Sequence, residues 1–155
     1  KDVFLVMIGG GSQLKTVKNI LENEQLLDKC WFPGDCSNVS SLMLGFDVFC
    51  LPSKAEGISN TLLEAMASGL PVVATKVGGN ADIALDGETA TLIESDNIDE
   101  LVEALATYVN DAGLRKQHGK AGRQRIEKSL SLKQMVSNYE AMYLKEMNNL
   151  HQEVA

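Results

Sequence analysis

Two glutamates, Glu56 and Glu64, stand eight positions apart in the stretch EGISNTLLEAMASGLPVVAT, residues 56–75. A carboxylate can accept hydrogen bonds from the hydroxyl groups of a ligand. The residues between the two glutamates are small and polar, and they lead into a predicted helix. Backbone N–H groups at a helix start favour an anion such as phosphate. The stretch therefore combines a candidate phosphate site with two carboxylates beside it.

This helix is bounded by residues that typically start and stop helices. Ser59 and Asn60 are favourable N-caps. Gly69 suits the left-handed conformation that ends a helix, and Pro71 cannot continue one. We therefore expect a helix over residues 60–68, and its first N–H groups should lie at the carboxyl edge of a parallel sheet, where ligands bind. A nucleoside diphosphate that bears a sugar fits this edge, with ribose at one glutamate and the sugar at the other.

Short apolar runs alternate with longer helical patterns up to residue 93. The apolar runs are typical of strands buried on both faces, and they lie at residues 3–10, 30–32, 47–52, 70–75 and 89–93. Helical spacing is found between them, at residues 12–28, 37–44 and 60–68. The alternation predicts an α/β fold with a Rossmann-like parallel sheet flanked by helices.

The pattern after residue 93 is helical. Asp96 is a candidate N-cap for a helix that continues to residue 111, and a second helical pattern covers residues 114–129. A long last helix is expected over residues 132–151, with an apolar stripe longer than a small sheet needs. We expect both histidines of this region, His118 and His151, on the surface.

Composition excludes several classes of protein. The 155 residues hold 14 Lys and Arg against 21 Asp and Glu, a net charge of −7, and no basic stretch is interleaved with aromatics, so nucleic acid is not an expected partner. The sequence has three cysteines, an odd number that leaves one unpaired, and their spacing is not that of zinc ligands: Cys30, Cys36 and Cys50. This indicates reduced thiols in a cytoplasmic protein. The longest apolar run, at residues 3–8, is too short to span a bilayer. We expect one domain over residues 1–155.

Two glycine-containing stretches have less specific meanings. GGGS, at residues 9–12, leaves direct ligand contact and a simple strand-to-helix turn equally open, because its spacing matches neither the dinucleotide nor the P-loop pattern. VGGN, at residues 77–80, is expected to shape the loop after a strand without touching ligand. Trp31 is expected to pack beside the sheet.

The stretch PSKAEGISNTLLEAMASGLPVVATKVGGNADIALDG, residues 52–87, resembles the donor-binding signature of the retaining GT-B glycosyltransferases of family 4, the glycosyl transferases group 1. Glu56 and Glu64 stand at the two glutamates of that signature. The resemblance begins at VMIGGGS and WFPG and extends loosely into the terminal helices, so it covers most of the chain. It implies the C-terminal, donor-binding half of a GT-B fold with a helical C-terminal extension.

The resemblance also implies roles for individual residues. Glu64 would hold the ribose hydroxyls, and Glu56 would face the transferred sugar as a catalytic group that stabilises the transition state. The backbone that cradles the diphosphate and contacts the donor sugar would be that of Gly57, Ile58, Ser59, Asn60 and Thr61. Pro33 and Gly34 would help to enclose the base. No metal and no cofactor are expected beside the donor, a UDP- or GDP-linked sugar, because the helix dipole and basic side chains stabilise the leaving diphosphate.

Some features of that family are not found in this sequence. The Arg and Lys that clamp the diphosphate, and the N-terminal domain that supplies the acceptor site, would precede Lys1. Ala90 stands where many relatives have glycine. We therefore expect a fragment truncated on its N-terminal side, which binds donor weakly and is inactive alone.

The resemblance implies that the full-length protein is a hexosyltransferase of polysaccharide biosynthesis that acts on a glycan or a lipid-linked acceptor. Its partner would be its own N-terminal domain, to which the C-terminal helix crosses back, and that domain could add peripheral contact with a membrane. Two alternatives stay open: a noncatalytic nucleotide-binding or interaction module of the same fold, and an epimerase or phosphorylase on the same architecture.

Overall fold

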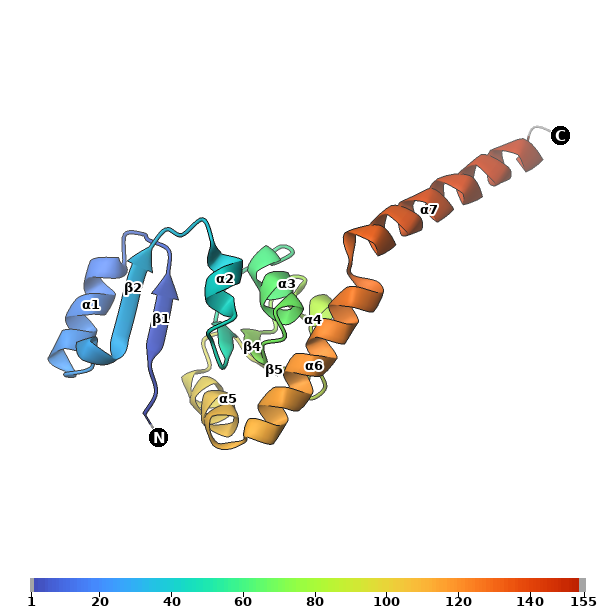
Figure 1. Ribbon diagram of the computed structural model, residues 1–155. Coiled ribbons are helices and arrows are strands. Elements are labelled where there is room, and N and C mark those ends of the chain that lie inside the picture. Colours follow the sequence, from blue (N-terminus) through green and yellow to red (C-terminus); the bar gives the residue numbers. More distant parts are fainter. Residues whose placement is uncertain (1, 154–155) are drawn as a thin grey trace. The chain divides into compact units, whose positions relative to one another are not determined.

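The computed structural model describes residues 2–153, and the side chains of that range except those at 148 and 150–153. The chain forms two compact units, Lys1–Phe46 and Asp47–Ala155, and each has its own parallel sheet (Figure 1). The predicted α/β class is confirmed. The single nucleotide-sugar-binding domain expected over residues 1–155 stays a prediction.

The first unit consists of two parallel strands with short helices. Its elements are β1 (Leu5–Ile8), α1 (Leu14–Asn23), the 3-10 helix η1 (Leu27–Lys29), β2 (Cys30–Gly34) and α2 (Val39–Met43). β1 pairs with β2 in parallel, and the register shifts between Val6 and Ile8. GGGS forms a turn in which Leu14 N donates to Gly11 O at 3.2 Å, and no observation bears on the alternative of direct ligand contact. Trp31 is 52% exposed, so the expected packing beside the sheet is wrong.

The second unit contains the three-stranded sheet and most of the helices. Its elements are β3 (Phe49–Leu51), α3 (Asn60–Ala67), β4 (Val72–Thr75), α4 (Asn80–Ile83), β5 (Ala90–Ile93), α5 (Ile98–Asn110), α6 (Ala112–Ser129) and α7 (Leu132–Glu153). The strands pair in parallel in the order β3-β4-β5. Every residue of the central strand β4 is buried, as its uninterrupted apolar run predicts.

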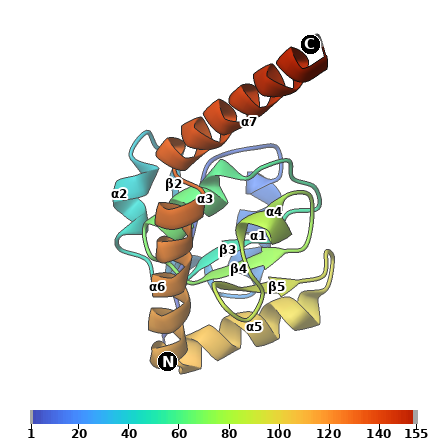
Figure 2. The same cartoon turned by 90° about the vertical axis from the view of Figure 1, so that its right-hand side faces the viewer.

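Of the helices of this unit, α5 packs on the sheet and α6 packs on the helix α3. On one side, Tyr108 and Ala104 of α5 form a core cluster with Val73 of β4 and Ile93 of β5. α6 packs against α3, and Figure 2 shows the two helices alongside each other. Gly119 of α6 makes this approach possible, because a Cβ at this position would lie 2.1 Å from the carbonyl oxygen of Gly69.

His118 of α6 is buried, which corrects the expectation of a surface residue. Its side chain is only 4% exposed, and its Nδ1 lies 2.7 Å from the hydroxyl of Tyr108. Burial lowers the pKa of His118, and a hydrogen bond with the Gly87 backbone and the charge of Asp86 act in the opposite direction. Burial raises the pKa of Tyr108. The pair is therefore a neutral polar contact inside the core.

The helix ends of this unit are capped by side chains. Asn97 caps α5, because its Oδ1 accepts from Glu100 N at 3.1 Å, so the N-cap predicted at Asp96 is wrong by one residue. Asp96 takes a left-handed conformation instead, with φ of 61°. Arg125 of α6 donates to the carbonyl oxygens of Ile83 and Asp82, both at 2.7 Å, and thereby holds the end of α4.

The last helix, α7, confirms the helix expected over residues 132–151. Its apolar side chains are exposed along most of its length: Leu132, Met135, Val136, Tyr139, Met142, Tyr143, Leu144 and Met147. The rings of Tyr139 and Tyr143 stack with centroids 6.5 Å apart. The side chain of His151, which was expected on the surface, lies outside the described side chains. Within residues 2–153, no helix has both the length and the apolar character that a membrane crossing requires.

Candidate functional site

The loop between β3 and α3 carries the predicted site, and α3 begins as the sequence predicts. Ser59 is the N-cap, with its Oγ accepting from Leu62 N at 3.3 Å. The same Oγ lies 3.1 Å from the hydroxyl of Thr61. α3 thus presents its first N–H groups at the carboxyl edge of the sheet, beside two hydroxyls. This arrangement suits a phosphate group.

The other end of α3 has the geometry predicted for Gly69. Its φ is +79°, a left-handed value that glycine adopts without strain. Gly69 N donates to Met66 O at 3.0 Å and Leu70 N donates to Ala65 O at 3.1 Å, the two bonds of a Schellman motif. Both ends of the site helix are therefore fixed by local sequence, which explains why the predicted range 60–68 differs from Asn60–Ala67 by one residue.

The loop 77–80 follows β4, as expected for VGGN, and it also supports the backbone of Glu56 and Gly57, a contact that was not predicted from the sequence. Gly79 N donates to Gly57 O at 2.8 Å. Gly78 has φ of +52°, and a Cβ there would lie 1.8 Å from the carbonyl oxygen of Glu56. Any larger residue at position 78 would therefore displace Glu56.

Asn80 continues this support into the core. Its side chain is fully buried, and its Nδ2 donates to Thr75 O at 3.0 Å. Among the described residues, Asn80 Oδ1 has no hydrogen-bond partner. The loop 77–80 is thus tied to the end of β4 as well as to the Glu56 loop.

The two glutamates occupy different surroundings. The carboxylate of Glu56 is half-buried, and its Oε1 accepts from Ser53 Oγ at 2.7 Å. Glu64 lies on α3, two residues beyond the residue that the N-cap bonds, and its side chain is exposed. The Glu56 carboxylate is therefore hydrogen-bonded to its own loop, whereas Glu64 is open to solvent.

The predicted site residues divide between the two units. Glu56, Gly57, Ile58, Ser59, Asn60, Thr61 and Glu64 lie together on one loop and helix of the second unit. Pro33 and Gly34 belong to β2 of the first unit, where Gly34 O accepts from Gly9 N at 2.8 Å. Their predicted role in enclosing the base stays a prediction.

Two hydroxyl residues near the site were missed from the sequence. Besides the bond from Ser53 to Glu56, Thr75 Oγ1 donates to the carbonyl oxygen of Ser53 at 2.6 Å. Both residues stand at or just after the end of a strand, Ser53 after β3 and Thr75 at the end of β4. Their position at the carboxyl edge was the available signal, because that edge is where ligands bind in parallel sheets.

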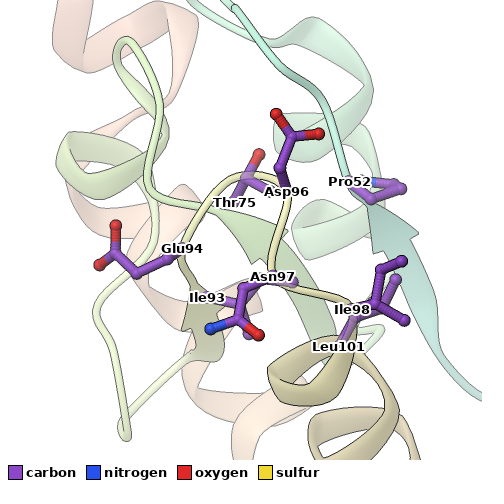
Figure 3. Close-up of a pocket in the computed structure, with 8 residues that line it drawn as sticks. All are labelled: Pro52, Thr75, Ile93, Glu94, Asp96, Asn97, Ile98 and Leu101. Atoms are coloured by element: carbon purple, nitrogen blue, oxygen red, sulfur yellow. The ribbon is translucent and has the colours of Figure 1, made fainter.

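A pocket of about 170 Å³ also opens at this edge, next to the start of α5 (Figure 3). It is lined by Pro52, Thr75, Ile93, Glu94, Asp96, Asn97, Ile98 and Leu101. Glu94 and Asp96 place negative charge at its rim, and Lys54 pairs with Asp96 at 2.8 Å. Glu94 pairs in the same way with Lys76 at 3.6 Å, so both carboxylates are balanced by lysines. None of the predicted site residues lines the pocket.

The other titratable groups do not form a reactive centre. Cys30, Cys36 and Cys50 are free thiols, as predicted, and each is half-buried. Burial raises the pKa of Cys50 to about 11, so this thiol is protonated at neutral pH. In the part of the chain that the structure describes, no three His, Cys, Asp or Glu side chains gather in a way that could hold a metal ion.

Comparison with known proteins assigns the chain to a family. Residues 1–125 match the model of the family described as glycosyl transferases group 1. The chain belongs to this family. The resemblance to the C-terminal domain of GT-B glycosyltransferases is thereby confirmed.

One similar protein is the N-acetyl-alpha-D-glucosaminyl L-malate synthase of Bacillus anthracis, 29% identical over 142 residues. The match covers 92% of this chain but only 37% of that protein. The chain therefore spans well under half the length of this relative.

Two solved structures show the same fold. The C-terminal domain of a glycosyl transferase group 1 family protein from Francisella tularensis is 25% identical with a TM-score of 0.77, and the match covers 83% of this chain and 70% of that one. HepE of Anabaena, solved in complex with UDP, is 21% identical with a TM-score of 0.82, over 93% of this chain and 41% of that one. These neighbours share the mixed α/β fold of this chain, with parallel sheets flanked by helices.

Proposed function

We propose that the chain is the donor-binding, C-terminal domain of a retaining glycosyltransferase, which transfers a sugar from a nucleoside-diphosphate sugar to a glycan or a lipid-linked acceptor. The observation that carries the proposal is the fixed Glu56 loop directly before the capped start of α3, at the carboxyl edge of a parallel sheet. The family membership and the UDP complex of HepE support this class of ligand.

The diphosphate would lie at the start of α3. The N–H groups of the first turn and the helix dipole favour its negative charge, and the loop from Gly57 to Thr61 lets the backbone approach it. As the bond to the sugar breaks, negative charge grows on the departing diphosphate. Donors fixed in advance at this place stabilise that charge without further rearrangement. No metal or cofactor is part of the proposal.

The two glutamates would act at opposite ends of the donor. Glu64, exposed on α3, would accept hydrogen bonds from the ribose hydroxyls. Glu56, held by Ser53, would face the sugar and stabilise the positive charge that develops at its anomeric carbon. The acceptor would attack from the face on which the diphosphate leaves, so the configuration at that carbon would be retained.

The remaining parts of the activity belong to the full-length protein. Its N-terminal domain would supply the acceptor site and cover part of the exposed apolar stripe of α7. We place the protein in the cytoplasm, with peripheral membrane contact through that domain, in the synthesis of polysaccharides. The 155-residue chain alone would bind donor weakly and transfer nothing.

Calorimetry of the full-length protein against UDP-glucose, UDP-N-acetylglucosamine, GDP-mannose and NAD tests the donor class. We expect binding of at least one nucleotide sugar and none of NAD, because the sequence lacks the dinucleotide glycine fingerprint. Tight NAD binding without response to nucleotide sugars would contradict the proposal. Donor binding without turnover in the presence of glycan or lipid-linked acceptors would favour the noncatalytic module. NMR of the anomeric configuration of the product tests whether the configuration is retained.

A further inference from the structure

We propose that Ser53 and Thr75 are positioning residues that orient the Glu56 carboxylate for catalysis, an inference that rests on the function proposed above. Ser53 Oγ donates to Glu56 Oε1 at 2.7 Å, and Thr75 Oγ1 donates to the carbonyl oxygen of Ser53 at 2.6 Å. These two bonds connect the carboxylate to the end of the central strand.

The direction of each bond is fixed by chemistry. An ionised carboxylate and a carbonyl oxygen can only accept, so both hydroxyls must donate. Thr75 has one hydroxyl proton, and Leu51 O at 3.5 Å is a much poorer acceptor for it than Ser53 O. The proton therefore lies toward Ser53, and it fixes the backbone from which the Ser53 hydroxyl reaches Glu56.

The anchor of this connection is rigid. Thr75 is the last residue of β4, every residue of which is buried, and its own backbone carbonyl accepts from the buried Asn80 amide at 3.0 Å. The hydroxyl that bonds Ser53 therefore lies on a buried strand and not on the exposed loop itself. Hydrogen bonds thereby connect Ser53, and through it Glu56, to the core of the second unit.

The backbone of Glu56 is restrained independently. Gly78 packs directly against its carbonyl oxygen, and Gly79 N donates to Gly57 O at 2.8 Å. With backbone and Oε1 both fixed, the second carboxylate oxygen remains for the ligand. Among the described residues, none donates to Glu56 Oε2, so this oxygen is the one that can face the sugar.

A flexible glutamate side chain loses rotamer freedom when it must be oriented in the transition state. Orientation that exists beforehand removes this cost from the chemical step, as in other sites where a charged group is fixed in advance. Loss of the Ser53 hydroxyl should therefore lower kcat. It should leave the donor KM nearly unchanged, because Ser53 itself does not contact the nucleotide in the proposed mode of binding.

The test uses the full-length protein and measures release of UDP or GDP from UDP-glucose, UDP-N-acetylglucosamine and GDP-mannose. We expect Ser53→Ala to lower kcat by about 10- to 100-fold, with donor KM and bare-nucleotide affinity within about twofold. Ser53→Thr keeps the hydroxyl and should restore most of the rate. Thr75→Val should act in the same direction, and Thr75→Ser should be much milder.

Thr107→Val is the matched control, because the hydroxyl of Thr107 donates to Glu103 O at 2.9 Å on the exposed face of α5, away from this loop. It should leave kcat unchanged. Thermal unfolding of each variant separates misfolding from misorientation. Should Ser53→Ala unfold the protein, Thr75→Val, which removes the other hydroxyl of the connection, still measures the effect against Thr107→Val, and a normal kcat in Thr75→Val would then overturn the proposal.

A double-mutant cycle with Glu56→Gln decides whether the effect passes through the carboxylate. If it does, Ser53→Ala should cost little more in the Glu56→Gln background. An equal loss in both backgrounds, or a normal kcat in Ser53→Ala, overturns the positioning role and leaves the proposed function intact. Failure of the unmodified protein to turn over any nucleotide sugar overturns both.

Discussion

The loop that carries Glu56 and the packing beneath α6 are held by different kinds of contact. In the loop, a serine hydroxyl bonds a carboxylate and a glycine N–H bonds a carbonyl oxygen, so the contacts orient one charged group. Beneath α6, Gly119 approaches the backbone of Gly69, and His118 is buried against Tyr108. We conclude that changes in the first region should alter kinetics, whereas changes in the second should alter the free energy of unfolding.

The largest effect is expected from Gly119→Ala. The added Cβ would lie 2.1 Å from Gly69 O, a backbone atom that cannot rotate away, so α6 and α3 would have to separate. We expect a loss of about 3 kcal/mol or more in the free energy of unfolding, measured by urea denaturation of the 155-residue chain. Gly122→Ala, on the same helix, meets its nearest atoms at 3.6 Å and should cost far less. Equal losses for the two variants would contradict this account.

Glu56→Gln should produce the largest kinetic effect. The amide keeps the shape of the side chain but removes the charge that opposes the developing positive charge of the sugar. We expect kcat of the full-length protein to fall by about 10²-fold or more, with bare-nucleotide affinity and thermal unfolding unchanged. A variant with normal kcat would reject the catalytic role of Glu56.

Glu64→Gln should have a smaller effect of another kind. A ribose contact is made equally in the ground state and the transition state, so its loss weakens binding without slowing the chemical step. We expect the donor KM and the nucleoside diphosphate Kd to rise by about tenfold, while kcat changes little. Titration of the full-length variant with UDP and GDP checks this, and unchanged affinity for both nucleotides would reject the contact.

The smallest effect is expected from the titration of His118. Because burial lowers its pKa in the folded state, the unfolded chain binds the proton first as pH falls. The contribution of neutral His118 is thus complete above its ordinary pKa, near 6.5, and is lost as pH falls from there toward the lowered value. Urea denaturation at pH 8 and below pH 6 should reveal the loss, and His118→Gln should flatten this part of the profile. An unchanged profile in that variant would show that another group is responsible.

Local signals predicted the site helix, and long-range contacts account for what was missed. Ser59 and Gly69 act through hydrogen bonds within a few residues, so their roles could be predicted from neighbouring letters alone. His118 was placed on the surface because its partner, Tyr108, lies on the preceding helix, and no pattern within α6 marks that contact. The hydrogen bond between Thr75 and Ser53 was missed for the same reason, because the two residues are 22 positions apart in sequence.

The boundary errors have a local explanation. Asp96 and Asn97 are both acceptable N-caps by residue type, and the choice between them depends on which one the loop places in the extended conformation. The left-handed turn at Asp96 leaves the cap to Asn97. The family signature identified the candidate site residues of the second unit without this information, because it fixes residue types at each position.

Trp31 is the only tryptophan of the sequence, and it lies half exposed in the first unit. Its fluorescence therefore comes from a residue of the first unit, while the buried Tyr108 belongs to the second unit. A single denaturation series that follows both the tryptophan fluorescence and the near-ultraviolet dichroism would test whether the two units unfold together, without any added label.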